Sequence, residues 1–263
     1  MKSRRFIVIL FVVFIAFLML APTQSVTKVD MANTFAGTSP EHWLGTDNLG
    51  RDVFSMVANG CRRTLEVVVI ATVVGLLAGT VLGLLAGYYG GLLETIIQFL
   101  SDLLLIIPSF IVALVFMGIF GFSPFNAGVV LGIGGIGGYC QQMMILSKQL
   151  KYDEFILSER IIGISDLRII FWHILPNVKN ALLTFMANHA SSAVVSYAGL
   201  AYIGLGTDVT TPDWGSMIYQ NRLYIVNYPG LVLCPTLGIF MLALFFHLMF
   251  DNRNAGKKVS IYE

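Results

Sequence analysis

Charged and hydrogen-bonding side chains gather in one segment of this chain, from Phe155 to Asn177, between two long apolar runs. Ionised groups are costly in hydrocarbon, so this segment is expected to lie in water between two membrane-spanning helices. Ion pairing and hydrogen bonding to a partner surface are the chemistry that such side chains can supply there. The ionisable residues of the segment are Glu159, Arg160, Asp166, Arg168 and His173.

The order of residues in this segment predicts a docking element. A helix from about Tyr152 to Ile162 is expected to end at Gly163, a residue type that favours helix C-termini. Ser165 can cap a second helix, whose positive first turn suits Asp166. Pro176 fits the first turn of the following span. Four apolar side chains need a covering surface, either a partner or the chain's own inner face: Ile161, Ile162, Ile164 and Leu167.

Polar side chains inside the apolar runs are candidates for a transport pathway. Asn188, Ser192 and Ser196 share one helix face at about 100° per residue. Such a stripe can line a water-filled path or make interhelical hydrogen bonds, and the sequence leaves both open. An intramembrane carboxylate is a functional candidate unless it lies near an interface. The pathway candidates are Asn188, His189, Ser192, Tyr197 and Asp102.

The motifs predict no catalytic residue, no metal site and no cofactor. His189 could bind a metal ion, but a lone histidine is more often a structural donor. The three cysteines are widely spaced and lack a CxxC pair. The run from Gly132 to Gly137 matches a dinucleotide fingerprint only formally, because it is embedded in a spanning helix, and no phosphate-binding P-loop occurs. A net charge of +1 offers no basic field for nucleic acid.

The elements that position these side chains are membrane-spanning helices. The chain is 56% hydrophobic and 12% charged, against about 25% charged in soluble domains. A span takes about 20 apolar residues. The first candidate could be the core of a signal peptide, but the residues after it suit cleavage poorly and an uncleaved span is expected. The six predicted spans are Phe6–Ala21, Thr64–Tyr88, Leu93–Phe120, Phe125–Leu146, Ala181–Gly206 and Leu231–Phe250.

Charge asymmetry predicts the orientation of the chain. With the N-terminus inside, eleven Lys and Arg residues fall on the inner side and five on the outer, which places both termini and the charged segment in the cytoplasm. The predicted organisation is a first span with an outer segment (1–63), a five-helix core (64–250) and a cytoplasmic tail (251–263). The core includes a loop at 149–177, named here the charged loop.

Two features predict how the helices pack. Gly75, Gly79, Gly83 and Gly87 recur every four residues, so they share one face and allow another helix to approach closely. Pro108 lies within the third span and is expected to kink it.

Four segments together resemble the dipeptide, oligopeptide and nickel family of ABC-importer permeases. Gly163 followed by HILP (173–176) resembles the cytoplasmic EAA loop of such permeases. HWLGTDNLGRD (42–52) resembles the family's outer LGTD-x-x-GRD signature. GYYGG (87–91), followed by Asp102 and Pro108, is similar to its second and third spans. GLG (204–206) with PDWGSM (212–217) is similar to its segment after the fifth span.

The resemblance implies an all-α type I permease with six spans, which does no chemistry itself. Implied partners are a second homologous permease, two cytoplasmic ABC ATPases, an extracytoplasmic solute-binding protein and the lipid bilayer of a bacterial cell membrane. The residues assigned to ATPase coupling are Arg160, Gly163, Ser165, Asp166 and Leu167. The E-A-A positions read Leu-Ser-Glu here, so the usual glutamate is missing and Glu159 or Glu154 is its candidate replacement. Tyr197 stands where an acidic residue is common in the family.

The implied substrates are peptides, nickel or metal–metallophore complexes. His189, His247 and the eleven methionines favour a metal complex slightly. Two other functions stay open, namely a secondary carrier or channel and a membrane scaffold that transports nothing. The absence of inverted repeats argues against a carrier.

Overall fold

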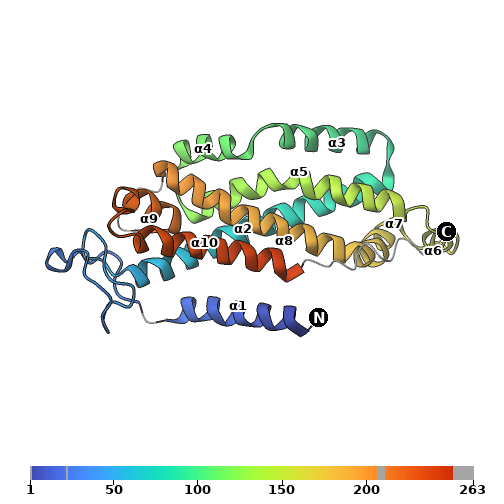
Figure 1. The fold of residues 1–263 in the computed structure, drawn as a ribbon. Coiled ribbons are helices and arrows are strands. Elements are labelled where there is room, and N and C mark those ends of the chain that lie inside the picture. Colours follow the sequence, from blue (N-terminus) through green and yellow to red (C-terminus); the bar gives the residue numbers. More distant parts are fainter. Residues whose placement is uncertain (1, 22, 206–210, 251–263) are drawn as a thin grey trace.

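The computed structural model describes residues 2–21, 23–205 and 211–250 as an elongated bundle of helices (Figure 1). Among these residues the only strand-like pairing is an isolated bridge between Thr46 and Asp52. The predicted tail at 251–263 and the predicted end of the fifth span at Gly206 lie outside the described residues. The long helices are α1 (Lys2–Leu20), α2 (Val53–Tyr89), α3 (Gly91–Ile106), α4 (Ser109–Phe120), α5 (Pro124–Leu150), α8 (Leu175–Leu200) and α10 (Gly230–Phe250).

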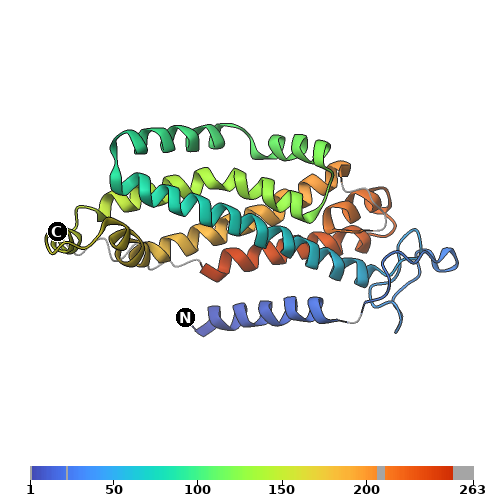
Figure 2. The same cartoon turned by 180° about the vertical axis from the view of Figure 1, so that it is seen from behind.

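Helix α2 runs the length of the bundle, from the loops of residues 23–52 to the charged loop (Figure 2). It begins at Val53, well before the predicted start at Thr64, because the Asp52 side chain caps it by accepting the backbone N–H of Ser55 at 2.7 Å. Its 37 residues span about 55 Å at 1.5 Å each. Both of its ends therefore extend beyond a hydrocarbon layer of about 30 Å.

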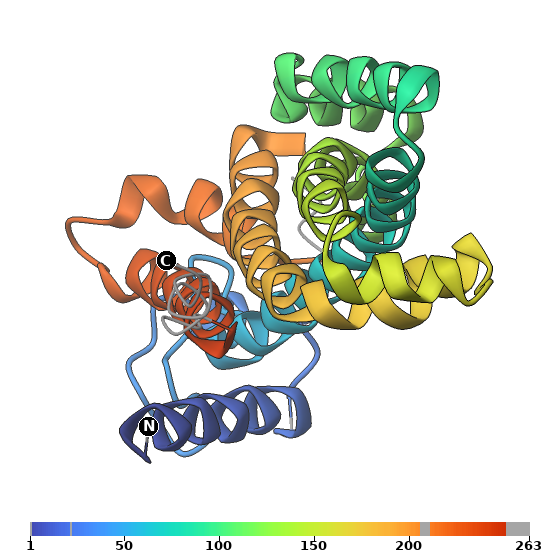
Figure 3. The same cartoon turned by 90° about the vertical axis from the view of Figure 1, so that its right-hand side faces the viewer.

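Helix α5 lies at the centre of the bundle, between α2, α8 and the α3–α4 pair (Figure 3). Its glycines face several neighbours at once. A Cβ atom at Gly132 would meet Val74 of α2 at 2.7 Å, and one at Gly137 would meet the Ser101 carbonyl of α3 at the same distance. The GIGGIG run is thus a close-packing helix surface that has neighbours on several sides.

The four glycines of α2 at positions 75, 79, 83 and 87 lie against α5. A Cβ atom at Gly83 would come within 2.3 Å of the Cys140 carbonyl oxygen, and one at Gly87 would come equally close to that of Met144. The backbones of the two helices are therefore nearly in contact, which only glycine permits at these positions.

The third predicted span is broken at Pro108. Helices α3 and α4 meet there at a bend of 78°, so the predicted kink is a full interruption. Ile107 has an extended backbone (ψ 120°), as the residue before a proline prefers. Pro108 has no N–H to continue the hydrogen bonds of α3.

By length and composition, three helices among the described residues can cross a membrane: α2, α5 and α10. The bent pair α3–α4 makes a fourth if it crosses as one span. The described apolar stretch of α1, Phe11–Leu20, is shorter, and α8, with its polar side chains, is not among the three. The structure thus gives three or four spans by these criteria, against the six predicted.

The charged loop leads into α8 without a break in the helix. The short helix α7 (Asp166–Arg168) passes into a π-helical turn, η2 (Ile169–Ile174), and then into α8. Pro176 lies in the first turn of α8. The proline ring would clash with the carbonyl four residues earlier in a regular α-helix, and a wider turn precedes it here.

Candidate coupling loop and transport pathway

The charged loop contains a short helix that ends in a glycine turn. Helix α6 (Glu154–Ile161) is followed by Gly163 at φ +82°, a left-handed conformation that favours glycine. The Gly163 N–H donates to the Arg160 carbonyl at 3.1 Å. Ser165 lies at the N-cap position of α7, but its side chain makes no capping hydrogen bond. The glycine turn therefore sets the angle between α6 and α7.

Tyr88, near the end of α2, connects both sides of this turn. Its hydroxyl donates to Asp166 Oδ1 at 2.7 Å and accepts from Arg160 Nε at 3.0 Å. The Arg160 guanidinium also lies over the Tyr88 ring, 4.7 Å from its centroid, which is a cation–π arrangement. Two predicted coupling residues, Arg160 and Asp166, are thereby brought together by Tyr88, a residue that was not among the coupling residues predicted from the sequence.

Buried isoleucines anchor the charged loop to the bundle. Ile156 of α6 and Ile169 and Ile170 of η2 are completely buried. They pack in one cluster with Leu84 of α2 and Met143 of α5. The apolar contacts fix the loop on the ends of α2 and α5, which leaves its opposite side open.

The open side of the charged loop is apolar. Ile161 is 86% exposed, Ile162 75% and Leu167 57%. Ile164 differs from the expectation, because it is half-buried and packs against the isoleucine cluster. Large apolar side chains so exposed outside the spans mark an interaction surface. We name Ile161, Ile162 and Leu167 the apolar face of the loop.

The two carboxylates considered for the missing glutamate differ in environment. Glu159 pairs with His173, with 2.6 Å between Oε1 and Nδ1, and is half-buried. Glu154 is exposed in the first turn of α6. The contact with His173 occupies Glu159 within the loop, whereas the Glu154 carboxylate points to the surface.

The structure separates the five pathway candidates into three locations. Asn188 and Ser192 lie with Val195 on an exposed face of α8. His189 and Tyr197 lie inside the bundle. The ring centroids of His189 and Tyr139 are 5.3 Å apart, and the Tyr197 ring stacks on Phe122.

Asp102 lies elsewhere, on α3, and accepts a hydrogen bond from Gln141 of α5 at 2.5 Å. The five residues thus do not form one site. In the described part of the chain, no group of three or more His, Cys, Asp or Glu side chains could hold a metal ion.

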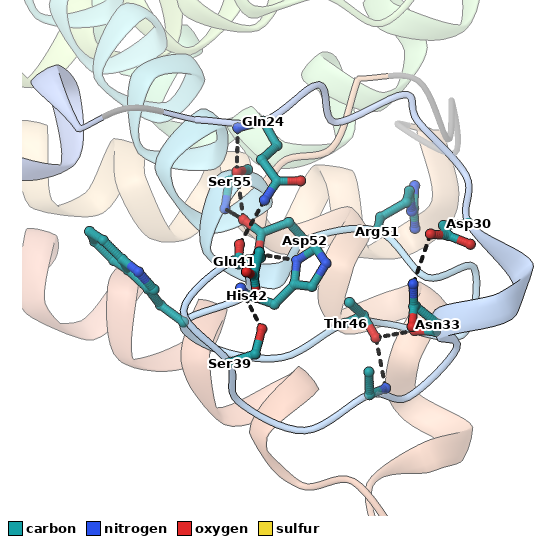
Figure 4. Close-up of polar contacts among 12 residues, drawn as sticks. Gln24, Asp30, Asn33, Ser39, Glu41, His42, Thr46, Arg51, Asp52 and Ser55 are labelled. Carbon is teal, nitrogen blue, oxygen red and sulfur yellow. Dashed lines mark hydrogen bonds and ion pairs between the residues drawn. The ribbon is translucent and has the colours of Figure 1, made fainter.

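At the other end of α2, residues 23–52 form a network of polar contacts (Figure 4). Arg51 and Asp47 form an ion pair at 2.6 Å, and each side chain is only 1% exposed. Arg51 also donates to Gln220 of α9 (Trp214–Asn221) at 3.0 Å. His42 contacts the carboxylate of Asp52 at 3.0 Å. The buried ion pair carries further hydrogen bonds, as such a pair requires, and it fixes this segment to α9.

Trp214 joins three helices at the same end. It is buried, and its Nε1 donates to the Val57 carbonyl of α2 at 2.9 Å. Gly60 of α2 and Gly238 of α10 leave room for its ring. A Cβ atom at the following Gly215 would come within 2.2 Å of the Ala198 carbonyl oxygen of α8. The hydrogen bond from Trp214 to Val57 spans 157 residues, so no local sequence pattern could have indicated it.

Comparison with a family model and comparison with known proteins both give matches that cover most of the chain. Residues 79–257 match a family described as "Binding-protein-dependent transport system inner membrane component". The chain is also similar to the glutathione transport system permease protein GsiD of Escherichia coli O6:K15:H31 (strain 536), Shigella boydii serotype 4 and Shigella sonnei. Each is 34% identical over 252 residues, which are 96% of this chain and 83% of the relative.

Proposed function

Because this chain belongs to the family of binding-protein-dependent transport system inner membrane components, we propose that it forms one half of the translocation pathway of its importer. The chain is the membrane permease subunit of an ABC importer and not itself an enzyme. ATP hydrolysis is assigned to two cytoplasmic ATPase subunits. The solute reaches the outer face on an extracytoplasmic binding protein.

The charged loop is the proposed contact with an ATPase. The observation that carries this assignment is the apolar face of Ile161, Ile162 and Leu167 on a loop whose other side is anchored by buried isoleucines. A surface that is apolar and held in place suits a protein partner. Closure of the ATPases on ATP would move this loop, and the bundle would then change between two arrangements.

The exposed polar face of α8 is the proposed lining of the pathway. Asn188 and Ser192 lie there beside Val195, on a helix with a marked share of polar side chains. A second, homologous permease packed opposite this face would enclose a polar route between the two chains. In this arrangement α1 and α8 also cross the membrane, as the first and fifth of six spans, and both termini lie in the cytoplasm.

We propose a short peptide of the glutathione type as the substrate. The relatives' name supports a peptide over nickel or a metal–metallophore complex. Uptake by cells with and without this chain distinguishes the classes, with labelled glutathione in one arm and a nickel chelate in the other. Loss of glutathione uptake alone is expected; loss of nickel uptake alone would reverse the assignment, and no loss in either arm would favour a scaffold.

Gly163→Pro tests the coupling assignment. Proline fixes φ near −65°, whereas Gly163 has φ +82° and its N–H donates to Arg160. We expect stimulation of ATP hydrolysis by the loaded binding protein to fall about tenfold or more, since the turn cannot form. Gly163→Asn is the control, because asparagine tolerates the left-handed conformation, and it should retain most of the stimulation.

Copurification provides the independent check. The complex should contain ATPase subunits in the wild type, and the proline variant should still insert in the membrane with the second permease. A secondary carrier would purify without any ATPase. Wild-type stimulation in Gly163→Pro would contradict the role of the loop.

A further inference from the structure

The charged loop packs on α2 through apolar contacts with Leu84, and its hydrogen bonds to α2 meet at one hydroxyl group. The loop is covalently continuous with α5 and with the helix that becomes α8, but not with α2. Arg160 and Asp166 lie 72 and 78 residues from Tyr88 in the chain. They also stand on opposite sides of the Gly163 turn. The Tyr88 hydroxyl, one donor and one acceptor, thus bridges the turn from a helix outside the loop.

The position of that hydroxyl is fixed by burial of the Tyr88 ring between α2, α5 and the charged loop. The Tyr88 side chain is 1% exposed and packs with Leu84 and Ile156. Arg160 and Asp166, by contrast, are exposed. In the part of the chain that the structure describes, the hydrogen bonds to the Tyr88 hydroxyl are the ones that hold their side chains. The immobile partner sets the position of the two mobile ones.

We propose that Tyr88 is a positioning residue that holds the charged loop against α2, so that loop movement reaches the α2–α5 pair as well as α8. The inference rests on the proposed function for its consequence in transport. The glycine contacts between α2 and α5 make this pair move together. Without the hydroxyl, the loop would keep its apolar contacts with α2 but lose the hydrogen bonds that hold Arg160 and Asp166 to that helix.

Tyr88→Phe removes both hydrogen bonds and keeps the ring that packs in the cluster and faces Arg160. Tyr89→Phe is the matched control, because the Tyr89 side chain is half exposed and its hydroxyl makes no hydrogen bond within the described residues. The readout is amide hydrogen exchange in the importer purified with its ATPase subunits in lipid nanodiscs. Informative amides are those of Ile162, Gly163 and Ile164, which donate to carbonyls within the loop.

In Tyr88→Phe we expect these amides to exchange about tenfold faster, equivalent to about 1.4 kcal/mol, and those of α5 to be unchanged. Tyr89→Phe should exchange at the wild-type rate. Unchanged exchange in Tyr88→Phe overturns the proposal, and equal acceleration in both variants also overturns it, since the effect would then be unspecific.

Asp166→Ala tests the same contact by removing the carboxylate that accepts the hydrogen bond from Tyr88. If the hydroxyl acts through Asp166, the double variant Tyr88→Phe/Asp166→Ala should exchange no faster than the faster single variant. Fully additive acceleration of amide exchange in the double variant overturns the proposal. Stimulated ATP hydrolysis should fall about fivefold in Tyr88→Phe, the lower end of typical coupling. Faster exchange with undiminished hydrolysis would support the positioning role and reject the loop as the coupling element.

Discussion

Asp213 is a carboxylate without solvent contact at the end of the bundle that carries residues 23–52. Its side chain caps α9 by accepting the Ser216 N–H at 3.0 Å, and the Ser216 hydroxyl accepts the Asp213 N–H. Burial raises the pKa of Asp213 above its ordinary value of 3.8, and this effect exceeds the opposing effects of the hydrogen bond from the Ser216 N–H and of the Arg63 charge. The capping bonds thus hold a group that the interior disfavours in its charged form.

Asp213→Asn is expected to stabilise the protein at neutral pH. Below 3.8 the carboxyl is protonated in both the folded and the unfolded state, so it adds no pH dependence. As pH rises above 3.8 the unfolded chain ionises first, and stability falls until the raised folded pKa has been passed. Asparagine keeps the cap and does not ionise, so it removes this loss of stability. The apparent Tm in detergent should rise by roughly 3 °C at pH 7 and hardly at pH 4.

Asp30→Asn is the control for this prediction. Asp30 lies near the surface and is half-buried, and a hydrogen bond from the Asn33 side chain lowers its pKa, so its removal should give a small effect of opposite sign. A gain for Asp213→Asn that is equal at pH 4 and pH 7 would contradict the role of the buried charge.

Some residues could be predicted from their neighbours in sequence, and others could not. The Gly163 turn follows from the local preference of glycine for a positive φ. Tyr88 acts across 72 and 78 residues, so its role depends on how α2 and the loop pack. The split of the α8 candidates between an exposed and a buried face likewise depends on which neighbours cover the helix.

At the scale of elements, contact between α2 and α5 depends on missing side chains. Gly83→Ala is expected to separate the two helices, because the methyl group would lie 2.3 Å from the Cys140 carbonyl oxygen. We expect a loss of about 1–3 kcal/mol, as for other overpacked interiors, and a lower apparent Tm in detergent.

Gly118→Ala is the matched substitution. Gly118 also lies in an apolar helix, but nothing lies within 4 Å of a Cβ atom there, so this variant should melt at the wild-type temperature or slightly above it. Equal melting temperatures for the Gly83 and Gly118 variants would show that α5 can move aside.

The long helices were predictable as elements because apolar length and glycine spacing are local features. The interruption at Pro108 was expected as a kink, since a proline alone does not determine whether neighbours accept a bend of 78°. The continuity of α7, η2 and α8 was not expected. A π-helical turn before Pro176 depends on the packing of Ile169, Ile170 and Ile174, all buried in the isoleucine cluster.

At the scale of the whole molecule, the proposed orientation places the charged loop inside the cell and the 23–52 segment outside. Single cysteines test this, with Cys234→Ser as background because Cys61 and Cys140 are buried. Ile162→Cys and Val226→Cys offer similarly exposed positions at the two ends, at 75% and 87%.

In intact spheroplasts a membrane-impermeant maleimide should label position 226 and spare position 162. Inverted vesicles should give the opposite result, since the excess of Lys and Arg predicts which side is cytoplasmic. Labelling of position 162 in sealed spheroplasts would reverse the orientation and remove the loop from the reach of any cytoplasmic ATPase.

The unbroken course of α2 has a mechanical consequence. A rigid helix of about 55 Å that pivots about its middle moves its two ends in opposite directions. A tilt of about 5° would shift each tip by about 2 Å. Asp52 and Tyr88 lie at the two ends of this helix. A displacement of one end on one side of the membrane would therefore move the other end in the opposite direction on the other side.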